Sequence, residues 1–341
     1  MESRERLGKV RVVKDGMKIT VVLCTYNRCE LMAEALESVA ASTLPESVDW
    51  EVLVVDNNST DRTHEVVEDF CQRHAGRFRY LFEPKQGKSN ALNAGIAAAK
   101  GEVLAFMDDD VIVEVDWLRN LTAPLFNGKW KGSGGRVLPR WVCPTPSWLP
   151  SQFYMSGPLA LFDQGDKPGV LAEPPIGNNM AFHRDVFQKY GGFRTDLGPR
   201  PGSEIRNEDS EFGRRLFAAG EQLCYEPSAV LYHLAPQKRL QREYFQAWWF
   251  DKARADIREF GPPKDAKWFI CGVPVLLLRR ILRWTLQWIV LTNPARRFEY
   301  KLKAWLNVGL IVECYRLSQT RTPVAEPETG TLRQRISDVH E

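Results

Sequence analysis

The chain has 341 residues, of which 44% are hydrophobic and 26% are charged, so it is long and apolar enough to bury a sizeable core. Its net charge is only +3, but residues 238–303 carry 15 Lys and Arg against six Asp and Glu, which leaves a net charge of −6 on the rest. Six of the 11 Trp also lie between Trp248 and Trp305. This asymmetry indicates a body with one role and a basic, aromatic C-terminal region with another.

Several classes of protein are disfavoured by the sequence. Its seven cysteines form no C-x-x-C and no His-paired spacing, which argues against a zinc site or a disulfide framework. The N-terminus, MESRERLGKVRVVKDG, lacks the apolar stretch of a secretory signal. The longest uncharged apolar run, Trp268 to Leu278, is too short to span a membrane. We therefore expect a cytoplasmic protein with reduced thiols.

The first 120 residues alternate two periodicities. Continuous apolar runs predict buried strands, and apolar residues at helical spacing between them predict helices. The expected strands are Ile19–Cys24, Glu51–Val55, Phe78–Phe82 and Glu102–Met107, and the expected helices are Glu30–Val39, Asp61–Cys71 and Lys88–Lys100. Asp61 is expected to cap its helix, and Gly101 to follow the end of the third. Such alternation predicts a mainly parallel α/β sheet covered by helices on both faces.

Polar residues follow three of these strands. Thr25-Tyr26-Asn27 comes after the first, Asp56-Asn57-Asn58-Ser59 after the second, and Asp108-Asp109-Asp110 after the fourth. Ligands of open α/β sheets bind outside the carboxyl ends of the strands. The three segments are therefore expected to converge on one rim of the sheet.

The later elements are less regular. The Pro- and Gly-rich segments 139–150 and 168–177 predict long loops over the rim. Further strands are expected at Asn178–His183, Gln222–Tyr225 and Ala229–His233, and an amphipathic helix at Glu208–Ala219. Beyond Pro236 the pattern is helical and basic. After about Ser318 the composition predicts a disordered tail.

The three adjacent aspartates need a counter-charge, and no Lys or Arg lies beside them in the sequence. A divalent cation such as Mg²⁺ or Mn²⁺ would relieve the repulsion, since such ions take oxygen ligands from one or two carboxylates and from substrate phosphates. An acidic turn exposed to water is the alternative. The position directly after a buried strand favours the cation.

Five segments in order resemble one enzyme family. VVLCTYNR (21–28), EVLVVDNNSTDRT (51–63), QGKSNALNAGIAAAKGEVLAFMDDDV (86–111), GNNMAFHRDVFQKYGGF (177–193) and NEDSEFGRRL (207–216) resemble the inverting family-two glycosyltransferases of GT-A fold. The resemblance covers about residues 17–235. It implies a glycosyltransferase domain at 17–235, preceded by an N-terminal arm at 1–16. The pattern and composition of the remainder predict a basic Trp-rich helical extension at 236–318 and a disordered tail at 319–341.

The resemblance implies roles on the donor side. Thr25, Tyr26, Asp56 and Asn57 would hold the nucleotide base, although relatives often carry a second Asp where this chain has Asn57. Lys88 would lie near the diphosphate. The D-x-D of the family maps onto Asp108 and Asp110, with Asp108 at the ribose, Asp110 at the metal and Asp109 beside them. Asp108 would also reach the metal, either Mg²⁺ or Mn²⁺.

Inverting transfer needs a base that takes the proton of the acceptor hydroxyl. By resemblance to the family's E-D motif, Asp209 is expected to be this base and Glu208 an acceptor contact. A plain acidic helix start is the alternative. His233 matches a histidine that in some relatives reaches the metal or the diphosphate. Three further residues are candidates for lining the acceptor pocket, namely Asn178, Asn179 and Asp185.

The C-terminal region carries basic amphipathic patterns. Arg280, Arg283 and Gln287 recur at helical spacing among Trp and aliphatic residues, Asn293-Pro294 interrupts the pattern, and a second helix is expected at Arg296–Leu317. Such helices suit an anionic membrane surface. A helical hairpin packed on the catalytic domain is the alternative. Association with the inner face of the cell membrane would suit a polyprenyl-linked acceptor.

The expected function is therefore the transfer of one sugar from a UDP-, GDP- or dTDP-sugar to a saccharide or a polyprenyl-linked acceptor in envelope or exopolysaccharide synthesis. Gln237-Lys238-Arg239-Leu240 keeps only the Gln of the Q-x-x-R-W motif of processive synthases, which favours single transfer. A nucleotidyltransferase would want a Gly-rich phosphate loop, and residues 21–28 contain no Gly. A nucleic-acid-binding protein would leave the acidic rim unexplained, so no nucleic acid is expected as a partner.

Overall fold

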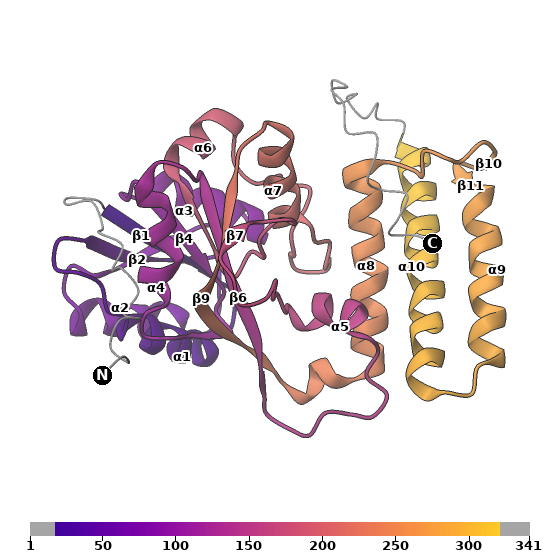
Figure 1. The fold of residues 1–341 in the computed structure, drawn as a ribbon, viewed down its shortest axis with the longest axis horizontal. Helices are drawn as coiled ribbons and strands as arrows, with labels where there is room; N and C mark the ends of the chain where they lie inside the picture. The colour runs from indigo at the N-terminus through magenta and orange to yellow at the C-terminus, as the bar shows by residue number, and fades with distance from the viewer. Residues whose placement is uncertain (1–17, 321–341) are drawn as a thin grey trace, which may run out of the picture.

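The computed structural model describes residues 18–320 and begins with the expected alternation of strands and helices (Figure 1). The elements are β1 (Lys18–Thr25), α1 (Cys29–Ala40), β2 (Asp49–Asp56), α2 (Thr63–Arg73), β3 (Phe78–Phe82), α3 (Lys88–Ala98) and β4 (Val103–Met107). The four strands pair in parallel in the order β3-β2-β1-β4. All seven predicted elements are confirmed, with shifts of a few residues at their ends.

The sheet continues with strands from the second half of the domain. They are β5 (Val111–Val113), β6 (Gly132–Trp141), β7 (Gly169–Val170), β8 (Met180–His183) and β9 (Leu223–Ala235). The order beyond β4 is β8-β6-β9-β5, with β7 also paired to β9, and β8 is antiparallel to β4. The helices of this half are α4 (Trp117–Thr122), α5 (Gln152–Leu159), α6 (Arg184–Tyr190) and α7 (Glu208–Ala218), with a short 3-10 turn, η1, at Ala123–Asn127. The predicted mixed α/β class is confirmed.

Each face of the sheet buries its own core. Met32 of α1, Phe70 of α2 and Trp117 of α4 pack on one face. Leu92 of α3 and Phe212 of α7 pack on the other. Because the central strands are covered on both faces, their residues are apolar without alternation, as in β4, where all five are buried.

Several local expectations were wrong. Gln222–Tyr225 and Ala229–His233 belong to one strand, β9, which crosses Pro227 with a register shift against β6. The expected loop from Pro139 begins only after Trp141, and the loop at 168–177 contains β7. Helix α3 ends at Ala98, so Gly101 is not its cap. A Cβ at Gly101 would lie 2.4 Å from the backbone nitrogen of Thr20, so glycine there allows the close approach to β1.

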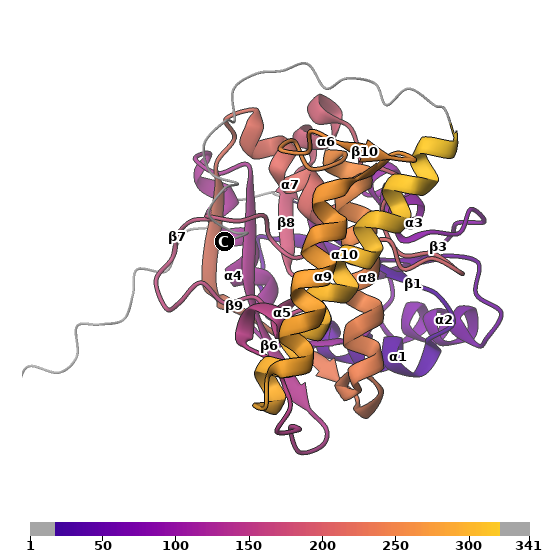
Figure 2. The same cartoon turned by 90° about the vertical axis from the view of Figure 1, so that its right-hand side faces the viewer.

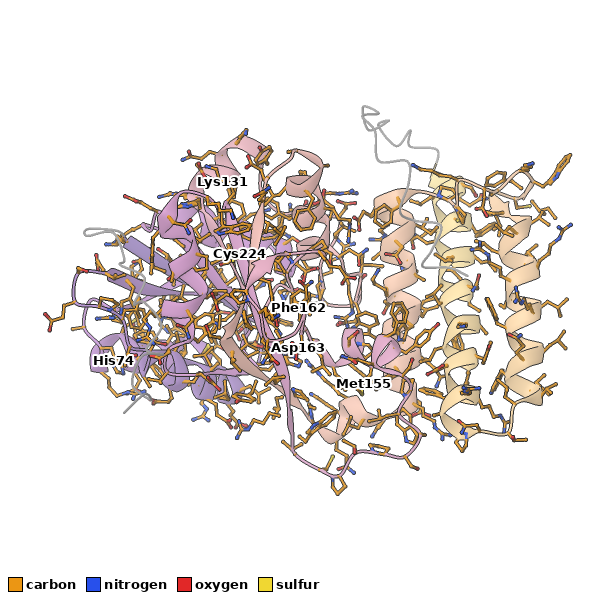
Figure 3. All side chains as sticks on the ribbon, in the orientation of Figure 1. His74, Lys131, Met155, Phe162, Asp163 and Cys224 are labelled. Atoms are coloured by element: carbon orange, nitrogen blue, oxygen red, sulfur yellow. The ribbon has the colours of Figure 1, made fainter. Side chains whose placement is uncertain are left out.

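Three long helices form a layer beside the sheet domain (Figure 1). After the 3-10 turn η2 (Gln237–Leu240) come α8 (Arg242–Phe260), the short strands β10 (Phe269–Ile270) and β11 (Val273–Pro274), α9 (Val275–Val290) and α10 (Pro294–Thr320). Helix α10 packs between α8 and α9. Met155 of α5 lies between the sheet domain and α8 (Figure 3) and joins a core with Phe245, Phe298 and Leu302. None of the helices in residues 18–320 combines the length and the apolarity needed to cross a membrane.

The expected ends of the chain are covered only in part. The expected N-terminal arm, 1–16, lies outside the described residues, and so does the predicted tail from residue 321 onward. Helix α10 continues to Thr320, two residues into the predicted tail.

Candidate active site

The three polar segments converge on one rim, as predicted. Strands β1, β2 and β4 are adjacent, so Thr25, Asp56 and Asp108 leave the sheet at the same edge. The Thr25 carbonyl accepts a hydrogen bond from the Asn57 N–H at 2.9 Å, and the Thr25 hydroxyl donates to Oδ2 of Asp109 at 2.9 Å. Side chains 84 positions apart in the sequence thus meet at the end of β4.

Each of the three aspartates contacts at least one basic side chain, and Arg28 contacts two of them. Asp108 lies 2.7 Å from the ammonium of Lys88, and Asp109 lies 3.0 Å from Arg28. Asp110 contacts three groups: Arg239 at 2.6 Å, Arg28 at 3.3 Å and the Nε2 of His233 at 3.3 Å. The counter-charges that the local sequence lacks therefore come from Arg28 between β1 and α1, from Lys88 of α3 and from Arg239 of η2, with His233 of β9 beside them.

These contacts set the charge states of the two buried aspartates. Burial favours the neutral acid of Asp110, but His233, Arg239 and Arg28 outweigh it and hold its pKa well below the usual range. Burial raises the pKa of Asp109, Arg28 opposes this, and the charges of Asp110 and Asp108 add to it. The cluster therefore keeps Asp110 ionised and makes Asp109 the weaker acid.

Lys88 is positioned by a loop that Asn57 holds in place. The Asn57 side chain donates to the carbonyls of Glu83 and Lys85, at 3.1 and 2.9 Å, and accepts from the Gly87 N–H at 2.7 Å. Gly87 has φ +129°, where a side chain would be strained. Helix α3 starts directly after it at Lys88. All three side-chain hydrogen bonds of Asn57 go to this loop, so the side chain positions Lys88.

Lys88 also reaches the opposite side of the rim. Its ammonium lies 3.8 Å from Glu208, on the first turn of α7. Burial acts to lower the pKa of Lys88, but Asp108 and Glu208 raise it above the usual range, so the cation is retained. Lys88 thus bridges the aspartate cluster and the predicted catalytic carboxylates.

Of the expected base contacts, Asp56 is buried and Tyr26 is partly exposed. Asp56 accepts hydrogen bonds from the hydroxyl of Tyr80 at 2.8 Å and from the Ser59 N–H at 2.9 Å. Asp61 accepts from the backbone N–H of Thr63 and of Cys29, both at 3.0 Å, so it serves the first residues of α2 and α1. The N-cap position of α2 is Arg62, so Asp61 lies one residue before the cap position that was expected of it.

The start of α7 presents Glu208 and Asp209 to the rim. Asn207, with φ +79°, precedes the helix and donates to Asp256 at 2.8 Å and to Glu259 at 2.9 Å, both on α8. Asp209 accepts from the N–H of Gly177 at 2.7 Å and from the N–H of Ser210 at 2.6 Å. The half-buried Asp209 carboxylate is therefore oriented by two backbone groups, and α8 fixes the helix end that carries it.

Glu208 is a weak acid in this setting. It is only 4% exposed, and burial together with the Asp209 charge raises its pKa to about 7, although Lys88 acts in the opposite direction. The raised pKa means that the folded chain holds a proton on Glu208 at pH values where an unfolded glutamate, with a pKa near 4.5, has lost it. This difference in proton binding couples folding to pH.

The pH dependence of stability should report this coupling. The folded state holds more protons between about pH 4.5 and 7, so the free energy of unfolding falls as the pH rises through this window. In the wild type the free energy of unfolding should fall by roughly 3 kcal/mol across this window, because each tenfold change in proton affinity is worth about 1.4 kcal/mol. We expect Glu208→Gln to lack this fall. Urea unfolding at pH 5, 6, 7 and 8 measures it. The control is Glu65→Gln, which changes an exposed residue in the first turn of α2 and should keep the wild-type pH dependence. If Glu208→Gln also kept the wild-type pH dependence, the raised pKa would not belong to Glu208.

The acceptor-side candidates separate in the structure. Asn178 is 1% exposed, and its amide oxygen and nitrogen have no hydrogen-bond partner among the described residues. Asn179 is occupied by Trp117 at 2.8 Å and by the carbonyls of Arg136 and Ala229, both at 2.9 Å. Asn178 and Asn179 precede β8, whereas Asp185 follows its C-terminal end and pairs with Lys131 at 2.7 Å. The expected place of Asp185 in the acceptor pocket at the rim was therefore wrong.

The residues present suit a metal ion that is completed by its substrate. Within residues 18–320, no group of three or more His, Cys, Asp and Glu side chains could hold an ion. Asp110 and His233 nevertheless form a buried carboxylate–imidazole pair, and Mg²⁺ or Mn²⁺ commonly takes few protein ligands and several phosphate oxygens. Asp108 faces Lys88 instead.

Three site residues had no predicted role. Arg28 ends the first quoted motif, and Arg239 lies in the segment compared only with the processive motif. Asn207 begins the E-D segment. Arg239 contacts both Asp110 and His233, with 2.7 Å between its Nη1 and Nε2 of His233. A pairing of Arg239 with residues 129 and six positions away could not be read from local spacing.

The sequence is similar to those of known glycosyltransferases. The profile of "Glycosyl transferase family 2" matches residues 20–191. A glucosyl-dolichyl phosphate glucuronosyltransferase of Haloferax volcanii is 30% identical over 241 residues, covering 68% of this chain and 75% of that protein. A succinoglycan biosynthesis protein of Rhizobium meliloti is 29% identical over 230 residues, covering 66% and 69%.

The fold agrees as well. A mannosyltransferase from Pyrobaculum calidifontis, solved with GDP-Man and Mn²⁺, superposes with a TM-score of 0.52 at 20% identity, covering 92% of this chain and 80% of that one. Its likeness confirms the expected GT-A architecture for this chain. The protein belongs to the family-two glycosyltransferases.

Proposed function

We propose that the protein is a metal-dependent, inverting glycosyltransferase that moves one sugar from a nucleoside-diphosphate sugar to a saccharide or polyprenyl-linked acceptor. The observation that carries the proposal is the bridge made by Lys88, 2.7 Å from Asp108 and 3.8 Å from Glu208. It places the aspartate cluster, suited to a metal and a diphosphate, beside the acidic start of α7. Donor and acceptor groups are thereby brought to one rim.

Asp110 and His233 would hold the ion on the donor side. When bound, the ion would neutralise the diphosphate as it leaves with the bond electrons. Lys88, Arg28 and Arg239 supply cations around the same position, and charge-assisted contacts to phosphate oxygens are stronger than neutral ones. Arg239 contacts both proposed ligands, so its guanidinium would have to leave Asp110 and His233 when the ion binds. It would then be free to pair with the diphosphate.

Asp209 is proposed as the base. The acceptor oxygen attacks the anomeric carbon, the bond from that carbon to the diphosphate breaks, and the hydroxyl proton passes to Asp209. The N–H groups of Gly177 and Ser210 hold the carboxylate in position for this transfer. Attack opposite the leaving group inverts the anomeric configuration. The buried amide of Asn178, next to Gly177, has no hydrogen-bond partner among the described residues and would pair with a sugar hydroxyl when the acceptor binds.

The donor and acceptor classes are proposed more coarsely. Thr25, Tyr26 and Asp56 would border the nucleoside, and Asp108 would lie near the ribose. Asn57 would act indirectly, by holding the 83–87 loop. Asp109 would also act indirectly, through its hydrogen bonds with Thr25 and Arg28. UDP-, GDP- and dTDP-sugars are the candidate donors. The similarity to a glucosyl-dolichyl phosphate glucuronosyltransferase and to a succinoglycan biosynthesis protein supports a lipid-linked or saccharide acceptor.

A donor screen tests the proposal. Thermal-shift measurements with UDP-, GDP- and dTDP-sugars, each with Mn²⁺, Mg²⁺ or a chelator, should reveal one nucleotide class whose stabilisation requires the ion. Incubation of that donor with polyprenyl-linked and free saccharides should then give a product of inverted anomeric configuration by NMR. A retained configuration would overturn the mechanism, and the absence of any ion-dependent donor would overturn the metal site.

A further inference from the structure

Helix α9 forms the side of the molecule farthest from the sheet (Figures 1 and 2). Its inner face packs on α10 through the buried Leu277 and the two tryptophans. Trp284 lies 5.8 Å from the ring of Tyr300, and the Lys303 ammonium lies 4.8 Å from the Trp284 ring. Trp288 lies 5.4 Å from the ammonium of Lys301. Both tryptophans therefore face α10. A membrane-facing surface on α9 would have to be formed by other residues.

The outer face of α9 carries an exposed aliphatic stripe. Leu278, Leu282, Leu286 and Ile289 recur at i, i+4, i+8 and i+11, which places them on one side of the helix. They are 40%, 63%, 55% and 63% exposed. Four large aliphatic side chains aligned in water over about 17 Å of helix are unusual on a surface that has no partner.

A short hairpin extends the apolar surface at the start of the helix. Trp268, Phe269 and Ile270 lie on and beside β10 and are 77%, 50% and 57% exposed. The Val275 N–H donates to the Trp268 carbonyl at 2.9 Å, so the hairpin is attached to the first residue of α9. We use "α9 surface" for Trp268–Ile270 with the four aliphatic residues of the stripe.

Basic residues border the α9 surface. Arg279 and Arg283 follow Leu278 and Leu282 by one position each, so they run beside the stripe, and both are exposed. Residues 261–300 contain seven Lys and Arg against two Asp and Glu. Among the described residues, Arg280 pairs with Asp265 at 3.6 Å, while Arg279 and Arg283 have no carboxylate partner. The surface thus combines exposed apolar side chains with uncompensated positive charge.

We propose that the α9 surface docks on an anionic lipid bilayer, with α9 lying in the plane of the interface. An interfacial helix inserts its apolar stripe among the acyl chains and pairs its basic residues with headgroups. A second copy of the chain fits less well, because a symmetric contact along α9 would bring Arg279 and Arg283 of both copies together. Docking does not depend on the proposed transfer reaction. If both hold, the enzyme is brought to the surface where a lipid-linked acceptor resides.

Vesicle flotation of the full-length protein tests the docking. We expect the protein to float with phosphatidylcholine vesicles that contain phosphatidylglycerol, to float much less with phosphatidylcholine alone, and to be released by high salt. Leu282→Asp with Leu286→Asp, and separately Arg279→Glu with Arg283→Glu, should each weaken vesicle binding more than tenfold. Each basic residue near such a membrane contributes about fivefold in binding, so the reversal of two exceeds tenfold. All four side chains are exposed, so the fold should persist.

Matched variants on the sheet domain are the controls. Val115→Asp with Val170→Asp changes two exposed apolar residues, and Arg62→Glu with Lys100→Glu reverses two exposed charges. These should float like wild type. No flotation of wild type at low salt, or equal loss in the controls, would overturn the proposal. Sedimentation equilibrium that shows a dimer broken by the leucine variants would instead assign the surface to a second copy. The ion-dependent donor thermal shift should be unchanged in every variant, so failure of docking and failure of the transferase proposal are distinguishable.

Discussion

Asp209→Asn is expected to lower the transfer rate by about 10²- to 10⁴-fold, the usual contribution of a general base, while nucleotide-sugar affinity stays within about twofold of wild type. The asparagine amide is nearly isosteric with the carboxylate and keeps an oxygen for the N–H of Gly177, whose own missing side chain leaves room for this contact. The variant should therefore fold and bind donor but lack the group that receives the proton. Rates from a coupled diphosphate-release assay and affinities from calorimetry measure the two effects separately.

The matched control is Glu211→Gln, which also removes a charge from the first turn of α7. Glu211 pairs with Arg215 at 2.6 Å, on the same helix, and should leave transfer within a few-fold of wild type. If Asp209→Asn instead loses donor binding, the carboxylate belongs to the donor side. If both variants lose activity equally, the charge at the helix start matters and not a proton-accepting group.

The sheet and its rim could be predicted because they depend on local patterns. Apart from Thr20 and Glu51, the runs Ile19–Cys24 and Glu51–Val55 are apolar, since helices cover both faces of their strands, and polar residues cluster where this cover ends. Parallel strands then bring those residues together, whatever the details of the loops. Strand β9 was harder, because Pro227 resembles a chain break in sequence, while the structure accommodates it with a register shift against β6.

The counter-charges of the site could not be predicted, because they depend on long-range placement. Arg239 follows β9, and the pairing of Val111 with His233 brings the end of that strand to Asp110. Asn207 matters through Asp256 and Glu259 on α8, a helix whose packing direction the sequence does not reveal. The direction of Trp284 and Trp288 has the same origin. Their spacing shows that they share a face with each other, but only the position of α10 shows which face is covered.

Asp110→Ala is expected to abolish the ion-dependent part of nucleotide binding, with at least about a 100-fold loss of affinity in Mn²⁺ and little change in a chelator. Asp110 lies against His233, Arg239 and Arg28 at 2.6–3.3 Å, and these groups hold its pKa well below the usual range, so it carries the negative charge that a cation needs. Loss of a metal ligand exceeds the 10- to 100-fold effect usual for groups that only support one. Mn²⁺ binding followed by electron paramagnetic resonance gives a readout independent of transfer.

Two further variants separate the loss of a metal ligand from the loss of a nearby charge. Asp116→Ala removes a half-buried carboxylate six residues away that pairs with Arg119 at 2.9 Å, and it should leave Mn²⁺ and nucleotide affinity unchanged. In the absence of nucleotide, Arg239→Ala should tighten Mn²⁺ binding, whereas Asp110→Ala should weaken it. The reason is that Arg239→Ala frees Asp110 and His233 from the guanidinium that contacts both. Unchanged ion affinity in Asp110→Ala would place the metal elsewhere. Weaker ion affinity in Arg239→Ala would mean that the guanidinium supports the pair and does not compete with the ion for it.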